Sequence, residues 1–88
     1  MTVEFLKHFS KDLDKVSSST VKNQIKQVII SLEKAENLQN MPNTKKLKGH
    51  RNAYRIRIGD YRLGLFLENN TVLLARILHR KDIYKMFP

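Results

Sequence analysis

The chain has 88 residues, of which 41% are hydrophobic, with only three glycines and two prolines. This composition indicates one folded domain over residues 1–88 and argues against disorder. There is no cysteine, which excludes disulfides and thiolate metal sites. The formal net charge of +9 is concentrated, because residues 1–44 carry a net charge of +1 and residues 45–88 a net charge of +8. A basic half of this kind predicts a polyanionic partner, with a solvated surface as the simpler alternative.

Targeting signals and metal motifs are missing from the pattern. The first eight residues combine an acid, a lysine and no long apolar run, which is unlike a signal peptide. No stretch approaches the ~18 apolar residues of a membrane span. We therefore expect a cytoplasmic protein without a membrane partner. The histidines at positions 8, 50 and 79 show no metal-ligand spacing, so we expect neither a metal nor another cofactor.

Apolar residues in the first half have helical spacing. Residues 3–6 fit a short opening strand, and Ser10 is placed to cap a short helix that ends at Lys15. Residues 17–20, a run of Ser and Thr, form a linker and a second N-cap before a long helix that ends near Glu36. The second helix carries an apolar stripe that indicates core packing: Val21, Ile25, Val28, Ile29 and Leu32. Two consecutive helices predict a helical hairpin.

After residue 45 the apolar period becomes two, which is typical of strands. Residues 54–58 and 61–67 alternate and are joined by Gly59-Asp60, a two-residue loop suited to a type II′ turn. This loop pairs Ile58 with Tyr61. It places one set of residues inward (Ile56, Ile58, Leu63, Leu65 and Leu67) and the other set on the opposite, open face (Arg55, Arg57 and Arg62).

A third strand over residues 71–78 has two possible registers. A two-residue loop at Asn69-Asn70 would point Arg76 into the core, and burial of an unpaired Arg is costly. A three-residue loop instead points Leu73, Ala75 and Ile77 inward and leaves Arg76 on the open face, so we expect this register. The predicted fold class is α+β, with the helical hairpin packed on one face of a small antiparallel sheet.

The open face of the first hairpin carries three converging arginines without a nearby acid. Like charges directly opposite on neighbouring strands are destabilising, so the layout indicates an external anion. Arginine binds phosphate in bidentate fashion, and a solvated sheet face is the alternative. Further basic residues are predicted to extend an RNA-binding surface: Lys45, Lys46, Lys48, Arg51, Arg76 and Lys81.

Two titratable residues near the C-terminus are candidates for chemistry. His79 could transfer a proton, although a lone histidine is more often satisfied locally at a strand end. Tyr84 could stack on a base or supply a hydroxyl. Its alternative is an aromatic residue that closes the core with Ile83 and Phe87.

The second half also resembles a known family. Four segments carry the resemblance, in order and at the right separations: Leu47-Lys48-Gly49, Tyr54-Arg55-Ile56-Arg57, Gly59-Asp60-Tyr61-Arg62-Leu63 and His79-Arg80-Lys81-Asp82-Ile83-Tyr84. They are similar to the RelE/ParE toxin superfamily of type II toxin–antitoxin systems, and the ending is more like RelE. The resemblance implies a RelE-like α+β fold and a ribosome-dependent endoribonuclease that cuts mRNA in the ribosomal A site and so inhibits translation. It also implies a cognate antitoxin as a protein partner.

The resemblance implies roles for individual residues. Catalytic roles carry over to Arg55, Arg57, Arg62, Arg80 and Tyr84, where Arg62 and Arg80 would stabilise the transition-state phosphate and Tyr84 would orient the nucleotide. The familiar RelE pattern has lysines at the positions of Arg55 and Arg57, and arginine is a poor general base. The base therefore stays open between His79, Tyr84 and ribosomal groups.

Two alternatives share the fold. A ParE-like protein would inhibit DNA gyrase without enzymatic activity, and a basic RNA-binding module would lack activity altogether. The Arg80…Tyr84 ending favours the RNA-cleaving toxin.

Overall fold

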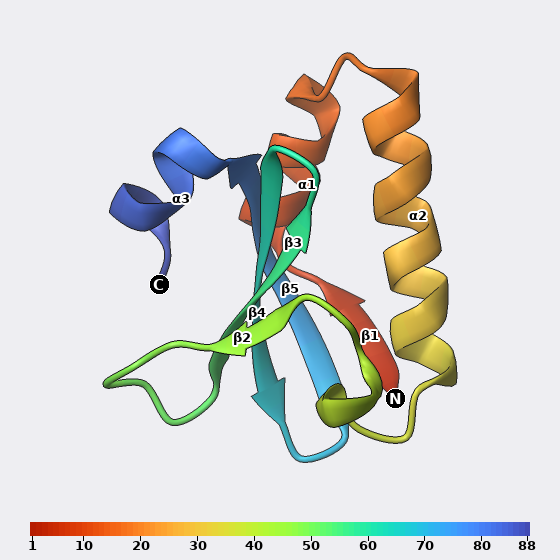
Figure 1. Cartoon of the computed structure of the whole chain (residues 1–88), viewed down its shortest axis with the longest axis vertical. Helices are drawn as coiled ribbons and strands as arrows, with labels where there is room; N and C mark the ends of the chain where they lie inside the picture. Colours follow the sequence, from red (N-terminus) through yellow and green to blue (C-terminus); the bar gives the residue numbers. More distant parts are fainter.

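Five strands form one sheet between the two N-terminal helices and a short C-terminal helix (Figure 1). The structure, a computed structural model, describes every residue from Met1 to Pro88. The elements in chain order are β1 (Thr2–Phe5), α1 (Lys7–Lys15), α2 (Ser19–Lys34), the 3₁₀ turn η1 (Leu38–Asn40), β2 (Thr44–Lys46), β3 (Ala53–Ile58), β4 (Tyr61–Glu68), β5 (Thr71–His79) and α3 (Arg80–Met86). No helix has both the length and the apolar character that crossing a membrane requires.

The predicted α+β class is confirmed, but the sheet is mixed and not antiparallel. Its strand order is β1-β5-β4-β3-β2, and β1 pairs with β5 in parallel, from Thr2 opposite Thr71 to Phe5 opposite Leu74. The opening strand is followed by two helices and has no neighbouring strand for a hairpin. Its partner therefore comes from the far end of the chain, which a local pattern does not reveal.

The helices differ from the prediction mainly at the N-terminal end of α1. α1 begins at Lys7, with Leu6 at the N-cap and no side-chain cap, so the predicted cap at Ser10 is wrong. The cap before α2 is confirmed in position, because the Ser18 hydroxyl accepts a hydrogen bond from the backbone N–H of Val21 (3.2 Å). The predicted stripe of α2 packs on the core.

The first hairpin has the predicted register. Ile58 lies opposite Tyr61, Arg57 opposite Arg62, and Arg55 opposite Gly64. Gly59 has a φ of +58°, whereas Asp60 is not in the left-handed region, as a type II′ turn requires. The arginines therefore lie on the face away from α1 and α2, as predicted.

The loop before β5 and the register of this strand both differ from the prediction. The loop has two residues, Asn69 and Asn70, because Glu68 lies opposite Thr71. A β-bulge then shifts the pairing between Gly64 and Leu65 and leaves Ala75 without a partner. Before the bulge, the residues that face α1 and α2 are Val72 and Leu74, not the predicted Leu73 and Ala75; after the bulge, the predicted Ile77 does so. The extra residue keeps Arg76 out of the main core despite the short loop.

A second, smaller core lies on the face that was predicted to be open. There α3 packs on the sheet through Ile83 and Phe87, which join Ala53 and Ala75 in a buried cluster. Leu78 of β5 also packs against this cluster. The C-terminal helix therefore covers part of this face and leaves the rest to the arginines.

Candidate functional site

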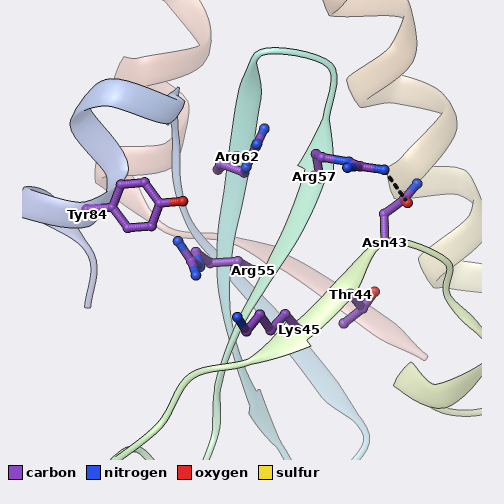
Figure 2. A pocket seen from close by; sticks show the side chains of 7 residues that line it. All are labelled: Asn43, Thr44, Lys45, Arg55, Arg57, Arg62 and Tyr84. Carbon is purple, nitrogen blue, oxygen red and sulfur yellow. Dashed lines mark hydrogen bonds between the residues drawn. The ribbon is translucent and has the colours of Figure 1, made fainter.

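Basic side chains from three strands and one aromatic side chain from α3 line a cavity of about 350 Å³ (Figure 2). We call it the arginine cavity, and its residues are Asn43, Thr44, Lys45, Arg55, Arg57, Arg62 and Tyr84. Five of the predicted site residues meet here. Four of them are cations, and the lining includes no carboxylate.

Strand pairing explains why the cations converge. Lys45 lies opposite Arg55 between β2 and β3, and Arg57 lies opposite Arg62 between β3 and β4. Residues 55 and 57 of one strand point to the same face. Such like-charge neighbours destabilise the sheet unless an anion offsets the repulsion. The cavity is therefore suited to a polyanion.

Hydrogen bonds orient two of the arginines. Nη2 of Arg57 donates to Oδ1 of Asn43 (3.1 Å), and the Arg57 backbone N–H donates to the Asn43 carbonyl (3.0 Å). Nη1 of Arg62 donates to the carbonyls of Gly59 (2.8 Å) and Tyr61 (2.9 Å) at the adjacent turn. Both guanidinium groups keep further N–H donors free.

Asn43 was missed by the sequence analysis. Its φ of +62° is in the left-handed region, where asparagine is tolerated better than most residues. This conformation lets one residue hold Arg57 through both main chain and side chain. The only local signal was an asparagine after Pro42 in a segment that ends a helix.

Arg55 and Tyr84 form the centre of the cavity. Cζ of Arg55 lies 4.6 Å from the centroid of the Tyr84 ring, which is within range of a cation–π interaction. The Tyr84 side chain is 68% exposed, so most of its ring is free to contact a ligand. Nε of Arg55 is buried and has no hydrogen-bond partner. A buried donor without a partner is rare in folded proteins.

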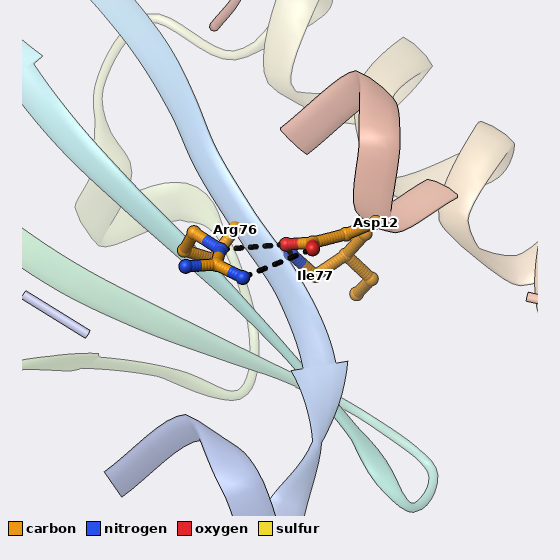
Figure 3. Close-up of polar contacts among 3 residues, drawn as sticks. All are labelled: Asp12, Arg76 and Ile77. Atoms are coloured by element: carbon orange, nitrogen blue, oxygen red, sulfur yellow. Dashed lines mark hydrogen bonds and ion pairs between the residues drawn. The ribbon is translucent and has the colours of Figure 1, made fainter. Parts of the chain in front are cut away.

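Arg76 is bound elsewhere in the fold, which corrects its predicted place on the basic surface. Nε and Nη2 of Arg76 donate to the two carboxylate oxygens of Asp12 at 2.7 and 3.0 Å (Figure 3). The Ile77 backbone N–H also donates to Asp12 (3.2 Å). The side-chain hydrogen bonds to Asp12 raise the pKa of Arg76. Arg76 therefore remains charged, but Asp12 neutralises it away from the arginine cavity.

His79 and the basic residues that follow it do not line the arginine cavity. Nδ1 of His79 accepts a hydrogen bond from the Lys81 backbone N–H (3.2 Å), and the imidazole ring packs edge-on against Tyr61 at 5.8 Å. It lines a different hollow, beside Asp12. Arg80 is exposed at the start of α3, where its backbone N–H donates to the Asp60 carbonyl (2.8 Å). Proton transfer by His79 inside the arginine cavity is therefore not supported by its position.

Three more of the predicted RNA-binding residues lie at the end of β2 and on the loop that follows it. Lys46, Lys48 and Arg51 line a shallow hollow with Gly49 and His50, between β2 and β3. These cations are exposed. They extend the positive charge of the molecule without contributing to the arginine cavity.

The geometry of the arginine cavity matches a nucleic-acid phosphodiester. Guanidinium groups offer paired N–H donors to phosphate oxygens. An exposed aromatic ring beside them provides a stacking surface for a base. The lining residues therefore supply both kinds of contact, N–H donors for a backbone phosphate and an aromatic ring for a base.

Comparison with known proteins identifies relatives of this chain. Residues 3–84 match a family model described as the ParE toxin of the type II toxin–antitoxin system parDE. A curated relative, toxin RelE3 of Methanocaldococcus jannaschii, is 40% identical over 89 residues, which cover all of both chains.

Solved structures show the same fold. The toxin in a RelB–RelE antitoxin–toxin complex from Methanococcus jannaschii is 39% identical, with a TM-score of 0.82 over 96% of this chain and 98% of that chain. A RelE–RelB complex from Pyrococcus horikoshii aligns with a TM-score of 0.74 at 21% identity, over 90% and 93% of the two chains. The family match and the 40% identical relative together show that this chain belongs to the RelE/ParE family of toxins from type II toxin–antitoxin systems.

Proposed function

We propose that this toxin is a ribosome-dependent endoribonuclease that cleaves mRNA in the ribosomal A site and thereby inhibits translation. One observation carries the proposal: the arginine cavity combines four cations, no carboxylate and an exposed tyrosine stacked on Arg55. A surface that only binds polyanions needs the positive charge but not an aromatic ring held against one of its arginines.

The proposed reaction is an internal transesterification. The 2′-oxygen of a nucleotide forms a bond to the adjacent phosphorus, and the bond from phosphorus to the 5′-oxygen of the next nucleotide breaks. The products are a 2′,3′-cyclic phosphate and a free 5′-hydroxyl, and the proton of the 2′-hydroxyl is balanced by the proton that the leaving oxygen gains. No water molecule or redox partner is consumed.

Charge stabilisation is the main contribution that we assign to the protein. The phosphorus centre gains negative charge as the 2′-oxygen attacks, so fixed N–H donors bind the transition state more tightly than the ground state. Arg55, Arg57 and Arg62 line the cavity together, so their free N–H donors can flank a phosphate. Tyr84 would stack on the neighbouring base and align the 2′-oxygen.

The proton acceptor is not an arginine, because a guanidinium keeps its proton at any working pH. The cavity lining includes neither a carboxylate nor an imidazole. We assign the proton transfers to the Tyr84 hydroxyl or to ribosomal groups, with orientation and charge as the dominant effects.

We also propose that a cognate antitoxin binds this toxin. Relatives of the same fold are found in complexes of RelE with the antitoxin RelB. The net charge of +9 would attract an acidic partner. Such a partner would block the arginine cavity either by covering it or by displacing α3.

The test uses ribosomes programmed with a defined mRNA. Primer extension should show cuts at the A-site codon only when toxin and ribosome are both present, and the 5′-ends should need phosphorylation before ligation. Uncut mRNA together with inhibition of gyrase supercoiling would instead support the ParE-like alternative. Binding without either activity would leave a basic RNA-binding module.

Binding to the ribosome should weaken steeply with salt. Each phosphate neutralised on a single strand contributes about 0.7 to the slope of log K against log salt concentration, so about five contacts give a slope near −3.5. Co-sedimentation of toxin and ribosomes at roughly 50 to 300 mM potassium chloride measures this slope. A flat titration would contradict a phosphate-led mechanism.

Replacement of Arg62 by alanine should lower cleavage about a hundredfold, as expected when one transition-state donor is lost. Arg80 lies outside the arginine cavity, and we expect the same loss for Arg80→Ala only because the family resemblance gives that position a catalytic role. The two variants should differ in stability. Arg62→Ala removes two hydrogen bonds to the turn carbonyls and should melt slightly lower, whereas the exposed Arg80 side chain makes no such bonds, so Arg80→Ala should melt like the parent. Parallel melting and cleavage assays check both, and parental cleavage rates would remove these arginines from the site.

A further inference from the structure

We infer that Phe87, seated on Gly64, is a positioning residue that holds Tyr84 over Arg55. The inference rests on the proposed function, because Tyr84 is assigned there to align the nucleotide. Phe87 does not line the arginine cavity. It would act through α3, the helix that carries Tyr84.

The contact between Phe87 and β4 requires a glycine. A β-carbon at position 64 would lie 2.7 Å from Cγ and Cδ2 of the Phe87 ring. Ordinary contact between carbon atoms is about 3.5–4.0 Å, so the ring would have to move by about 1 Å. The backbone of Gly64 is not in the left-handed region. The need for glycine is therefore steric and arises from the close approach of the ring.

Few contacts hold α3 on the sheet. The helix has seven residues, and Ile83 is the only one of them that is buried. Phe87, which follows the helix, is 7% exposed and packs against the Phe66 ring at 5.2 Å. A backbone hydrogen bond from Phe87 to Ile83 (3.0 Å) links the two anchors. Loss of the packing of Phe87 on the sheet would therefore free the C-terminal end of α3.

Tyr84 cannot hold its own position. With 68% of its side chain exposed, it lies next to the anchor Ile83 and three residues before Phe87. Its contact with Arg55 is a cation–π interaction, which contributes only about 0.5–1 kcal/mol at exposed sites. The placement of the ring must then come from the anchors of α3.

The sheet register places Phe87 close to Arg55. Gly64 is the cross-strand partner of Arg55, so the Phe87 ring rests on the residue beside the arginine that Tyr84 covers. Both members of the Arg55–Tyr84 pair are therefore positioned from the same point of the sheet. A small displacement of the Phe87 ring would separate them.

The main test replaces Gly64 by alanine in the full chain. We expect cleavage of ribosome-bound mRNA to fall at least about tenfold in kcat, with little change in ribosome affinity, since misplacement of an orienting group affects the rate most. Phe87→Ala should have the same effect and serves if Gly64→Ala does not fold. Met86→Ala is the matched control, because Met86 is exposed on the same helix and is not an anchor.

A double-variant cycle separates positioning from a general structural role. In a Tyr84→Ala background, Gly64→Ala should lower cleavage no further, because the two changes remove the same contribution. An equal loss in both backgrounds would overturn the inference, as would a parental rate for Gly64→Ala.

A measurement without cleavage keeps the inference distinct from the proposed function. The Nε–H resonance of Arg55 should be shifted by the ring current of Tyr84, and Tyr84→Ala defines its position without the ring. Gly64→Ala and Phe87→Ala should move the resonance most of the way to that position, whereas Met86→Ala should not. If the resonance stays at its parental position in both variants, the inference is wrong, whether or not the parent protein cleaves mRNA.

Discussion

Replacement of Arg55 by alanine should lower mRNA cleavage by about a thousandfold, the upper end of the loss seen for one transition-state donor. The effect should exceed that of the other arginines, because Arg55 lines the cavity and is also the arginine on which Tyr84 stacks. Single-turnover cleavage on saturating ribosomes measures the chemical step directly.

A charge-matched control distinguishes catalysis from attraction. Arg51→Ala removes the same charge from the separate basic loop and should weaken ribosome binding a fewfold without changing the single-turnover rate. Arg55→Lys keeps the charge but loses the planar fork, and should recover only part of the activity. Equal rates for Arg55→Ala and Arg51→Ala would mean that the arginine cavity attracts RNA without acting on it.

Replacement of Asp12 by alanine should destabilise the protein by about 3 kcal/mol, because it leaves a largely buried guanidinium without a partner. Side chains of Asp12 and Arg76 are 6% and 16% exposed, and the Ile77 N–H also loses its acceptor. For a domain of this size the melting temperature should fall by more than about 10 °C. Thermal unfolding followed by circular dichroism gives the measurement.

Asp14→Ala is the matched control for this effect. Asp14 is exposed on the same helix, so its loss should change the free energy of unfolding by less than about 0.5 kcal/mol. In the double variant Asp12→Ala/Arg76→Leu, removal of the unpaired charge should restore part of the lost stability. If Asp12→Ala melts like Asp14→Ala, the ion pair does not hold α1 to β5.

Local pattern was sufficient for the hairpin and for the arginines that line the cavity. Alternation in residues 54–58 and 61–67, together with the glycine of the Gly59-Asp60 turn, specifies one register, because a slip by one residue would move every apolar side chain to the wrong face. The same argument placed Arg55, Arg57 and Arg62 together, since side chains on one face of paired strands are neighbours. The N-terminal end of the long helix followed equally from local capping, whereas the helix ends at Lys34, two residues before the predicted Glu36.

Only the tertiary structure decided which other charged residues lie beside Arg55, Arg57 and Arg62. The bulge at Ala75 and the distant carboxylate of Asp12 remove Arg76 from the basic surface, although its sequence neighbourhood is that of an exposed strand residue. The seat of Phe87 on Gly64 brings Tyr84 to Arg55 across 29 positions of sequence, and parallel pairing joins β1 to β5. These contacts depend on how separate elements pack, and packing between distant segments leaves no periodic mark in either segment.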